Sequence, residues 1–390
     1  MTRRRYAVAA AMAALTSVTL VLGGCSALPG ERSRDDSDGD DAAYAMSVDC
    51  PEPPAEGTIK PTVAQLNSLV AQADLTYWQA ADIGASARLK DGRLVWIFGD
   101  TIRRSGVGPG MVANSMLITS GLCLSQLMPT ARGPIIPDVQ PGVVRWPMSV
   151  TVVEDQGVEK IVIFTGRIKR GSANDVWGFR YLGSDAVTFS VEPNQAPQLD
   201  EILPLTPDVD SANQVNWGSA AMVSAGYIYV YGTALPKGTA FGRALLVARS
   251  SLADPTDKGK WQFWDGKAWQ PDHLRATPII PAVGGVSQTL SVDEIDGSFV
   301  AVSKKDGDLG STVATWTSRE PVGPWTRAAA LEASFLTGKD EFAYAPLAHP
   351  EVPLADGKLL VSISRNTTDL SRLKQNPVIG RPRFAEINSP

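Results

Sequence analysis

Histidine and cysteine are scarce in this chain, with two His and three Cys among 390 residues. A zinc site of nitrogen and sulfur ligands needs about four such side chains, so this composition argues against one. The sequence also lacks a phosphate-binding glycine motif or a Gly-x-Ser-x-Gly nucleophile motif between a strand and a helix. We therefore expect no metal and no cofactor.

Clusters of positive charge are missing beyond the first few residues. Lys and Arg together number 36 and Asp and Glu 41, which gives a net charge of -5. Nucleic-acid binding depends on grouped Lys and Arg side chains that neutralise phosphates. Nucleic acid is therefore not an expected partner.

The apolar N-terminal run, Ala7 to Leu22, falls short of the roughly 20 residues that cross a bilayer. It follows Arg3–Arg5 and precedes Gly23, Gly24 and Cys25, an order typical of a signal peptide. The spelling Leu22-Gly23-Gly24-Cys25 resembles a lipobox, which implies a lipid on Cys25 and anchoring to the outer face of a bacterial cell membrane. The alternative is an ordinary secretory signal in which Cys25 is incidental. The Sec and twin-arginine export routes both stay open.

Two cysteines, Cys50 and Cys123, remain after Cys25. An exported chain meets an oxidising compartment, so we expect a Cys50–Cys123 disulfide, with two buried thiols as the alternative. Residues 26–56 are polar and charged without an apolar period, which predicts a disordered tether. The folded domain is then expected over residues 57–390.

Helical periodicity is almost absent from Thr76 onward. Five hairpins replace it, each with a strongly apolar second strand; these strands cover 94–100, 161–167, 227–233, 298–304 and 358–365. The turns before them are Asp91-Gly92, Gln156-Gly157, Ala225-Gly226, Asp296-Gly297 and Asp356-Gly357. Glycine suits such turns because tight hairpins need positive φ angles.

The repeats begin near residues 82, 147, 216, 287 and 344, and each adds an outer strand. The outer strands are expected at 115–119, 177–181, 244–249 and 312–316. Small sheets repeated in this way predict an all-β, five-bladed β-propeller. A two-sheet sandwich is the alternative, and it explains five similar hairpins less well.

Several motifs resemble those of the bacterial domain-of-unknown-function family 4185. They are the run 91–101 with its Trp-Ile-Phe-Gly-Asp-Thr ending, Asn114-Ser115, Gly323-Pro324-Trp325-Thr326, Tyr344-Ala345-Pro346 and His349-Pro350. The resemblance covers residues 75–387. It implies a five-bladed propeller like those of furanosidases, and some members of that family are endo-acting hydrolases of the D-arabinan in mycobacterial-type cell walls.

Asp82 and Asp100 are the candidate catalytic pair. They lie nine residues before and nine after Asp91 in the first hairpin turn, so an antiparallel pairing sets them opposite each other. Paired Cβ atoms are about 5 Å apart. Two carboxylates at that spacing suit glycoside hydrolysis, and their mutual repulsion should separate their pKa values. The alternative is that both are structural, with Asp100 capping a turn and Asp82 accepting from backbone amides.

The same hairpin geometry brings other strand ends to this face of the propeller. Amides, aromatics and cations there suit a hydroxyl-rich sugar. The candidate substrate-binding residues are Asn114, Arg167, Asn216, Trp217, Gln288, Lys304, Tyr344, His349, Arg365 and Asn366.

The second and third repeats differ from the furanosidases of glycoside hydrolase family 43, because they open with Pro147-Met148 and Asn216-Trp217 rather than with an acid. Either the first hairpin supplies both acids, or Asp340 or Glu341 supplies one, or catalysis has been lost. Two functions therefore remain. One is a surface lipoprotein hydrolase of arabinofuranose-rich wall polysaccharide, and the other is a non-catalytic propeller that binds wall glycan or a protein.

Overall fold

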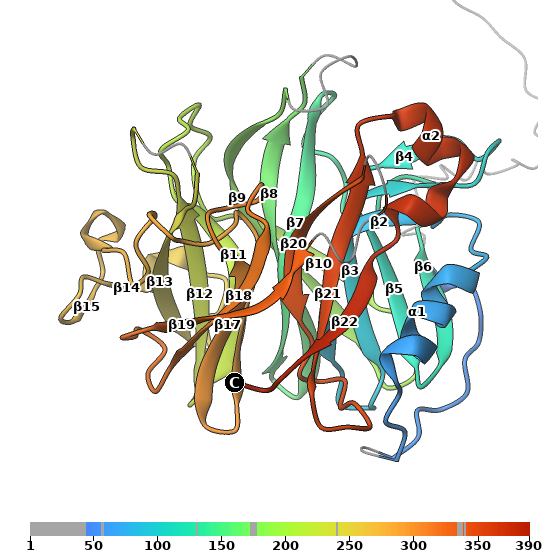
Figure 1. Ribbon diagram of the computed structural model, residues 1–390, viewed down its shortest axis with the longest axis horizontal. Helices are drawn as coiled ribbons and strands as arrows, with labels where there is room; N and C mark the ends of the chain where they lie inside the picture. Colours follow the sequence, from blue (N-terminus) through green and yellow to red (C-terminus); the bar gives the residue numbers. More distant parts are fainter. Residues whose placement is uncertain are drawn as a thin grey trace, which may run out of the picture. The chain divides into compact units, whose positions relative to one another are not determined.

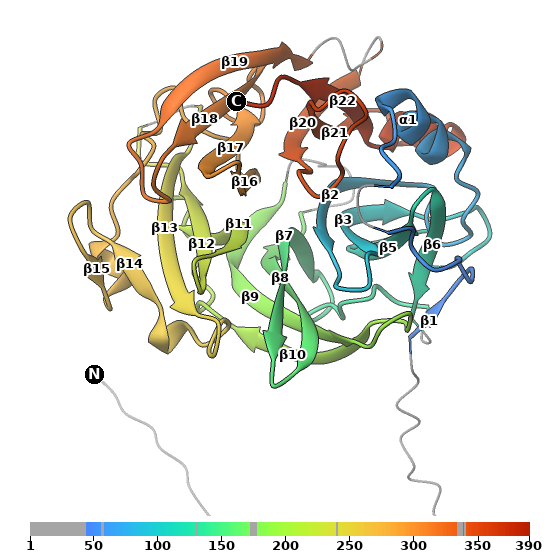
Figure 2. The same cartoon turned by 90° about the horizontal axis from the view of Figure 1, so that it is seen from below.

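Five antiparallel sheets stand around one axis and form a five-bladed β-propeller, which confirms the fold predicted from the sequence (Figure 2). The computed structural model describes residues 44–55, 58–129, 132–171, 178–238, 241–333, 338 and 341–390. None of the helices in these ranges is both long and apolar enough to cross a membrane.

The blades follow one another along the chain (Figure 1). Blade 1 contains β1 (Ala45–Met46), β2 (Ala80–Arg88), β3 (Leu94–Ile102), β4 (Met111–Val112), β5 (Ser115–Ser120) and β6 (Cys123–Met128). Blade 2 contains β7 (Val143–Asp155), β8 (Val158–Lys169), β9 (Arg180–Val191) and β10 (Gln198–Pro204). Blade 3 contains β11 (Asn216–Ser224), β12 (Tyr227–Ala234), β13 (Ala244–Ser251), β14 (Gln262–Trp264) and β15 (Trp269–Gln270).

The last two blades are smaller. Blade 4 contains β16 (Ser291–Ile295), β17 (Ser298–Lys304), β18 (Thr312–Ser318) and β19 (Thr326–Glu332), and blade 5 contains β20 (Glu341–Ala348), β21 (Leu359–Thr367) and β22 (Arg383–Ile387). The helical pieces are α1 (Val63–Gln72), α2 (Leu370–Gln375), η1 (Lys258–Lys260), η2 (His273–Arg275) and η4 (Pro377–Gly380).

The innermost strands, β2, β7, β11, β16 and β20, contact one another in sequence around the axis. β20 also contacts β2, so the ring is closed. The hydrophobic core lies between neighbouring blades; for example, Ile97 of blade 1 and Ile163 of blade 2 are fully buried in one cluster. Burying such a side chain contributes about 1.5–3 kcal/mol, so the blade interfaces hold the ring together.

The N-terminal part of the folded unit is fixed to blade 1. Cys50 and Cys123 form a disulfide with their Cα atoms 5.7 Å apart. β1 pairs with β6, so the expected tether boundary at residue 56 is wrong, because the strand pairing begins eleven residues earlier. Cys25 lies outside the described residues.

One outer strand also begins later than expected. The strand predicted at 177–181 starts at Arg180 in the structure, and it continues to Val191. The hairpin turns agree with the sequence, since Asp296 and Gly297 have φ angles of 49° and 72°. A positive φ at both turn residues matches the twist of the flanking strands.

Candidate active site at the axial end of blade 1

A β-bulge holds Asp82 opposite the end of β3. The Cα partners are Ala81 with Thr101 and then Ile83 with Phe98, so the register shifts at Asp82. Ile83 has a φ of 70°, in the left-handed region that β-branched residues rarely adopt. Its backbone N–H donates to Ser364 Oγ at 2.8 Å, which ties the bulge to blade 5. Strain of this kind costs about 1–3 kcal/mol and is common at functional sites.

Blade 5 supplies the partners of Asp82. Tyr344 OH donates to Asp82 Oδ2 at 2.8 Å. Asn366 Nδ2 in turn donates to the Tyr344 phenol oxygen at 3.4 Å. Burial, together with the nearby Asp100 charge, raises the pKa of Asp82 to about 7, although the Tyr344 hydrogen bond and the Arg170 charge oppose the rise. Part of the Asp82 surface remains accessible. This carboxyl group therefore holds a proton near neutral pH and can still meet a ligand.

Blade 2 supplies the partners of Asp100. Trp146 Nε1 donates to Asp100 Oδ1 at 2.8 Å, and Arg170 Nη1 donates to Oδ2 at 3.0 Å. Arg170 Nη2 also donates to Oδ1, which makes the ion pair bidentate. Burial raises the pKa of Asp100, while Arg170 and Trp146 counteract this rise. The Asp100 side chain keeps 25% of its surface exposed.

Aromatic rings border both carboxyl groups. Phe342 stacks on Tyr344 with centroids 5.6 Å apart, and Phe179 meets Trp146 edge-on at 4.9 Å. Arg170 lies over the Trp146 ring at 5.6 Å. The arrangement joins a carboxyl group whose pKa is raised to about 7, a second carboxyl group paired with Arg170, and apolar ring faces. This combination suits acid–base chemistry on a sugar.

Sequence reasoning missed Arg170, Trp146 and Asp138. The expected end of the second strand was Arg167, but β8 runs to Lys169, so Arg170 is the residue that reaches Asp100. Asp138 lies exposed in the connection between blades 1 and 2. Partial desolvation by neighbouring groups and the Asp100 charge raise its pKa, whereas the Arg170 and Arg145 charges lower it.

Tyr344 and Asn366 are the two predicted binding residues that the structure brings to the acid pair. Asn114 does not reach the acid pair, because its side chain is wholly buried. Its Oδ1 accepts from Ile136 N, and its Nδ2 donates to Ile136 O and Arg145 O. Arg167 is also buried, and it pairs with Asp185 and Asp208. Both residues brace the blade connections, so their expected role as direct ligands is corrected.

The predicted binding roles of Trp217 and His349 are also corrected. Trp217 is 2% exposed and meets Phe263 edge-on inside the core, so it offers no ring face to a ligand. His349 is fully buried between Ser86 Oγ and Ser362 Oγ, after the end of β20. His349 follows the last residue of β20, whereas Tyr344 in the earlier part of that strand is the residue that contacts Asp82.

The remaining candidates are engaged by other parts of the protein. Lys304 is buried and donates to Asp308 O and Ala343 O, and Arg365 donates to Arg381 O and Val378 O. Backbone carbonyls therefore engage both cations, which corrects their expected contact with substrate. Asn216 is 2% exposed, and Gln288 is half-buried and accepts from Arg243.

Two other acids in the described part of the chain, Glu341 and Asp185, are engaged by structural partners. Asp340 lies outside the described residues. Glu341 accepts from Gly338 N at 2.7 Å and pairs with Arg372 at 3.3 Å. In blade 2, Asp185 is wholly buried and pairs with Arg145 and Arg167, so it is a structural acid.

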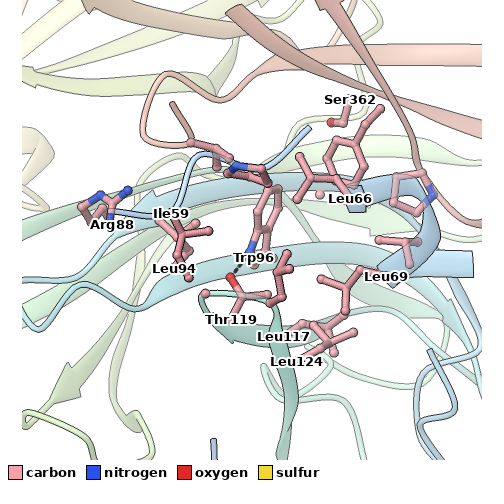
Figure 3. Close-up of a pocket in the computed structure, with 18 of the residues that line it drawn as sticks. Ile59, Leu66, Leu69, Arg88, Leu94, Trp96, Leu117, Thr119, Leu124 and Ser362 are labelled. Carbon is pink, nitrogen blue, oxygen red and sulfur yellow. Dashed lines mark hydrogen bonds between the residues drawn. The ribbon is translucent and has the colours of Figure 1, made fainter. Parts of the chain in front are cut away.

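An apolar cavity of about 90 Å³ lies between α1, the preceding segment and the sheets of blades 1 and 5 (Figure 3). Trp96 stands in its wall and donates to Thr119 Oγ1 at 3.1 Å, and Leu66 and Leu69 face it from α1. Its lining residues include no carboxylate, so this cavity is separate from the acid pair.

Comparison with known proteins places the chain in a family. The profile of the family described as "Domain of unknown function (DUF5005)" matches residues 65–389. The chain belongs to this family. The sequence motifs had suggested family 4185, and that number is corrected, because the DUF5005 profile is the one that matches. No curated protein matches this DUF5005 member.

Solved structures share the fold of this DUF5005 member. A glycoside hydrolase family 43 arabinoxylan arabinofuranohydrolase from Bacillus subtilis has a TM-score of 0.53 and 14% identity, over 82% of this chain and 67% of that one. A family 43 enzyme from Xanthomonas citri has a TM-score of 0.47 and 14% identity, over 84% and 93%. An endo-arabinase from Bacteroides thetaiotaomicron VPI-5482 has a TM-score of 0.45 and 10% identity, over 82% and 99%. At such identities the first likeness establishes the propeller fold alone.

Proposed function

We propose that this protein is a glycoside hydrolase that uses Asp82 and Asp100. The observation that supports this most is the split environment of the two carboxyls on one hairpin. Tyr344 contacts a carboxyl whose pKa is raised to about 7 by burial, and Arg170 holds the other as an ion pair. Glycoside hydrolysis needs one carboxylic acid and one carboxylate.

Asp82 is the general acid in this proposal. It carries a proton below about pH 7 and donates it to the oxygen of the departing sugar. Asp100 carries the negative charge, which either activates water or stabilises the cationic transition state. Arg170 and Trp146 fix its orientation through bonds to both oxygens, and Tyr344 fixes that of Asp82.

The proposed substrate class is an arabinofuranose-rich cell-wall polysaccharide. The structurally similar Bacillus subtilis enzyme is an arabinoxylan arabinofuranohydrolase, and this likeness supports a furanoside substrate here. We also propose export and lipid anchoring through Cys25, which would hold the enzyme near the wall. The competing proposal, a non-catalytic glycan-binding propeller, is favoured by the absence of acids at the openings of β7 and β11.

Incubation of the purified chain from residue 26 onward with arabinan, arabinogalactan, arabinoxylan and xylan tests the proposal. Release of reducing ends or free arabinose from an arabinose-containing polymer is the expected result. Binding without any release, measured by glycan affinity electrophoresis, would favour the non-catalytic propeller.

A further inference from the structure

An open cleft of about 730 Å³ lies where loops of blades 3 and 4 meet. Its apolar side chains are Phe241, Val283 and Leu309, from the loops that precede β13, β16 and β18. Each of the three is at least 62% exposed. Among the described residues, the other large apolar side chain exposed to this extent is Leu274, which does not line the cleft. Exposed apolar side chains gathered at one place mark a binding surface.

Backbone hydrogen bonds join the three loops of the cleft. Arg243 N donates to Val286 O at 2.8 Å, and Val286 N donates to Arg243 O at 3.0 Å. Asp306 N donates to Gly285 O at 2.9 Å, which ties the third loop to the second. Only glycine fits at residue 285, since a Cβ atom there would lie 2.2 Å from Arg243 O. The cleft is therefore pre-formed, and a pre-formed site loses little conformational freedom when a ligand binds.

The lining of the cleft is balanced in charge. Asp306 is its charged lining residue, and Asp306 Oδ2 accepts from Lys305 Nζ at 2.6 Å. Besides the three apolar side chains, the remaining lining residues are Gly238, Gly284 and Gly310. Apolar walls without a net charge suit an uncharged ligand that has C–H surfaces. A sugar of a neutral, arabinose-rich glycan is such a ligand.

The cleft and the acid pair belong to the same face of the propeller. Two of the cleft loops follow the ends of β12 and β17, and Asp100 lies near the end of β3, the corresponding strand of blade 1. Lys304, the last residue of β17, donates from Nζ to Ala343 O at 2.5 Å. The next residue, Tyr344, donates to Asp82. The third loop is thus tied to the strand that orients the acid pair, and one extended glycan can lie on the face that carries both sites.

We propose that this cleft is a distal glycan subsite, which holds a sugar of the polysaccharide beyond those at the acid pair. The inference rests on the proposed glycoside hydrolase function and adds to it a preference for long chains over short ones. The exposed ring of Phe241 lies against the C–H face of the bound sugar, and Val283 and Leu309 contact the rest of that face. Binding energy from a sugar remote from the reacting bond raises the affinity for the polymer.

Affinity electrophoresis with arabinan, arabinogalactan and arabinoxylan tests the subsite, because it measures binding whether or not the glycan is cleaved. Phe241→Ala and Leu309→Ala should each weaken binding of the polymer by about three- to tenfold, which corresponds to one lost apolar contact. Leu274→Ala is the matched control, since Leu274 is 80% exposed in η2 and lies outside the cleft. It should bind as the parent does. Circular dichroism shows that each variant is folded.

A second readout compares a long substrate with a short one. On a polymer that the parent cleaves, Phe241→Ala should raise KM by the same factor and leave kcat unchanged, because the lost contact is made equally in the ground state and the transition state. On a disaccharide prepared from the same polymer, KM should stay at the parent value, because a disaccharide at the acid pair does not extend to the cleft.

The outcomes separate the subsite from the hydrolase. Equal polymer binding by the parent, Phe241→Ala and Leu309→Ala overturns the subsite, while cleavage by all three would leave the hydrolase proposal intact. Polymer binding that depends on Phe241 without any cleavage supports the subsite and contradicts the hydrolase. No polymer binding by the folded parent also overturns the subsite. A dimer of the parent in analytical ultracentrifugation that Leu309→Ala disrupts would then assign the cleft to a second copy of the chain.

Discussion

At the scale of single residues, the environment of Asp82 carries the functional argument. The sequence predicted that Asp82 and Asp100 lie close together, because they are placed symmetrically about the Asp91-Gly92 turn. In the structure the Asp100 charge acts on Asp82. Their partners did not follow from sequence, because Tyr344, Trp146 and Arg170 come from blades 5 and 2. Local pairing rules identify residues that share a hairpin, whereas contacts between blades depend on how the ring closes.

The activity of the parent enzyme should fall as the pH rises through about 7. The general acid must be protonated, and burial raises the pKa of Asp82 to about 7. A pH profile of kcat/KM on a confirmed glycan measures this fall in activity on the alkaline side. A rate that stays constant from pH 6 to pH 9, a range of about two pH units above the expected pKa, would remove Asp82 from the acid role.

Arg170→Met should move the acidic limb of that profile to higher pH. Arg170 opposes the rise in the pKa of Asp100, so its loss raises this pKa and leaves less of the carboxylate ionised at low pH. Arg104→Met is the control, because Arg104 pairs with exposed Asp74 instead. An unshifted acidic limb would contradict the role given to Asp100.

Asp82→Asn should stabilise the fold at high pH while it removes activity. The folded-state pKa of Asp82 is raised, so the stability that its protonation provides is complete below the unfolded pKa and is lost as pH rises through about 7. The amide cannot ionise and avoids that loss. Thermal unfolding at pH 5 and pH 8.5 should show a smaller drop in Tm for the variant than for the parent. Equal drops would show that Asp82 is not desolvated.

At the scale of elements, the β2–β3 hairpin positions the acid pair. Its turn and second strand were predictable because the apolar run Leu94–Phe98 follows Asp91-Gly92, but the bulge at Asp82 was not. The bulge depends on a tertiary bond from Ile83 N to Ser364 in blade 5. The length of β8 was also underestimated by sequence, which is why Arg167 was chosen in place of Arg170.

Gly99→Ala should displace Asp82 and reduce turnover. A Cβ atom at residue 99 would lie 2.4 Å from Asp82 Oδ1, so the carboxyl group must move. A misplacement of about 1 Å costs on the order of 10²-fold in rate. Gly110→Ala is the control, since its Cβ would have no heavy atom within 4 Å. Turnover assays on the two folded variants test this prediction, and equal rates would contradict the tight placement of Asp82.

At the scale of the whole molecule, the repeat pattern was sufficient to predict five blades, because each hairpin repeats the same apolar strand and glycine turn. Burial around the axis was not predictable. Trp217 and His349 have residue types that often bind ligands, yet closing the ring of blades puts both in the core. The N-terminal strand β1 was missed for a similar reason, since it forms only by pairing with the distant β6.

The paired substitution Cys50→Ser with Cys123→Ser should destabilise the protein by about 2–5 kcal/mol. The disulfide closes a sequence separation of 73 residues and fixes the segment before α1 to blade 1. It joins the turn end of that blade, away from Asp82, so turnover at moderate temperature should persist. Denaturant unfolding of parent and variant measures the difference, and unchanged stability would show that β1 pairing alone holds this segment.

Hydrolysis of one confirmed arabinose-containing glycan by the parent, Asp82→Asn and Asp100→Asn is the most direct test of the proposed function. Product release should fall by about 10²–10⁴-fold in each variant, because each removes one carboxyl group of the pair. Retained glycan binding and circular dichroism should show that both variants keep the fold. A double Asn variant that releases product at the parent rate would contradict the assignment of catalysis to this pair.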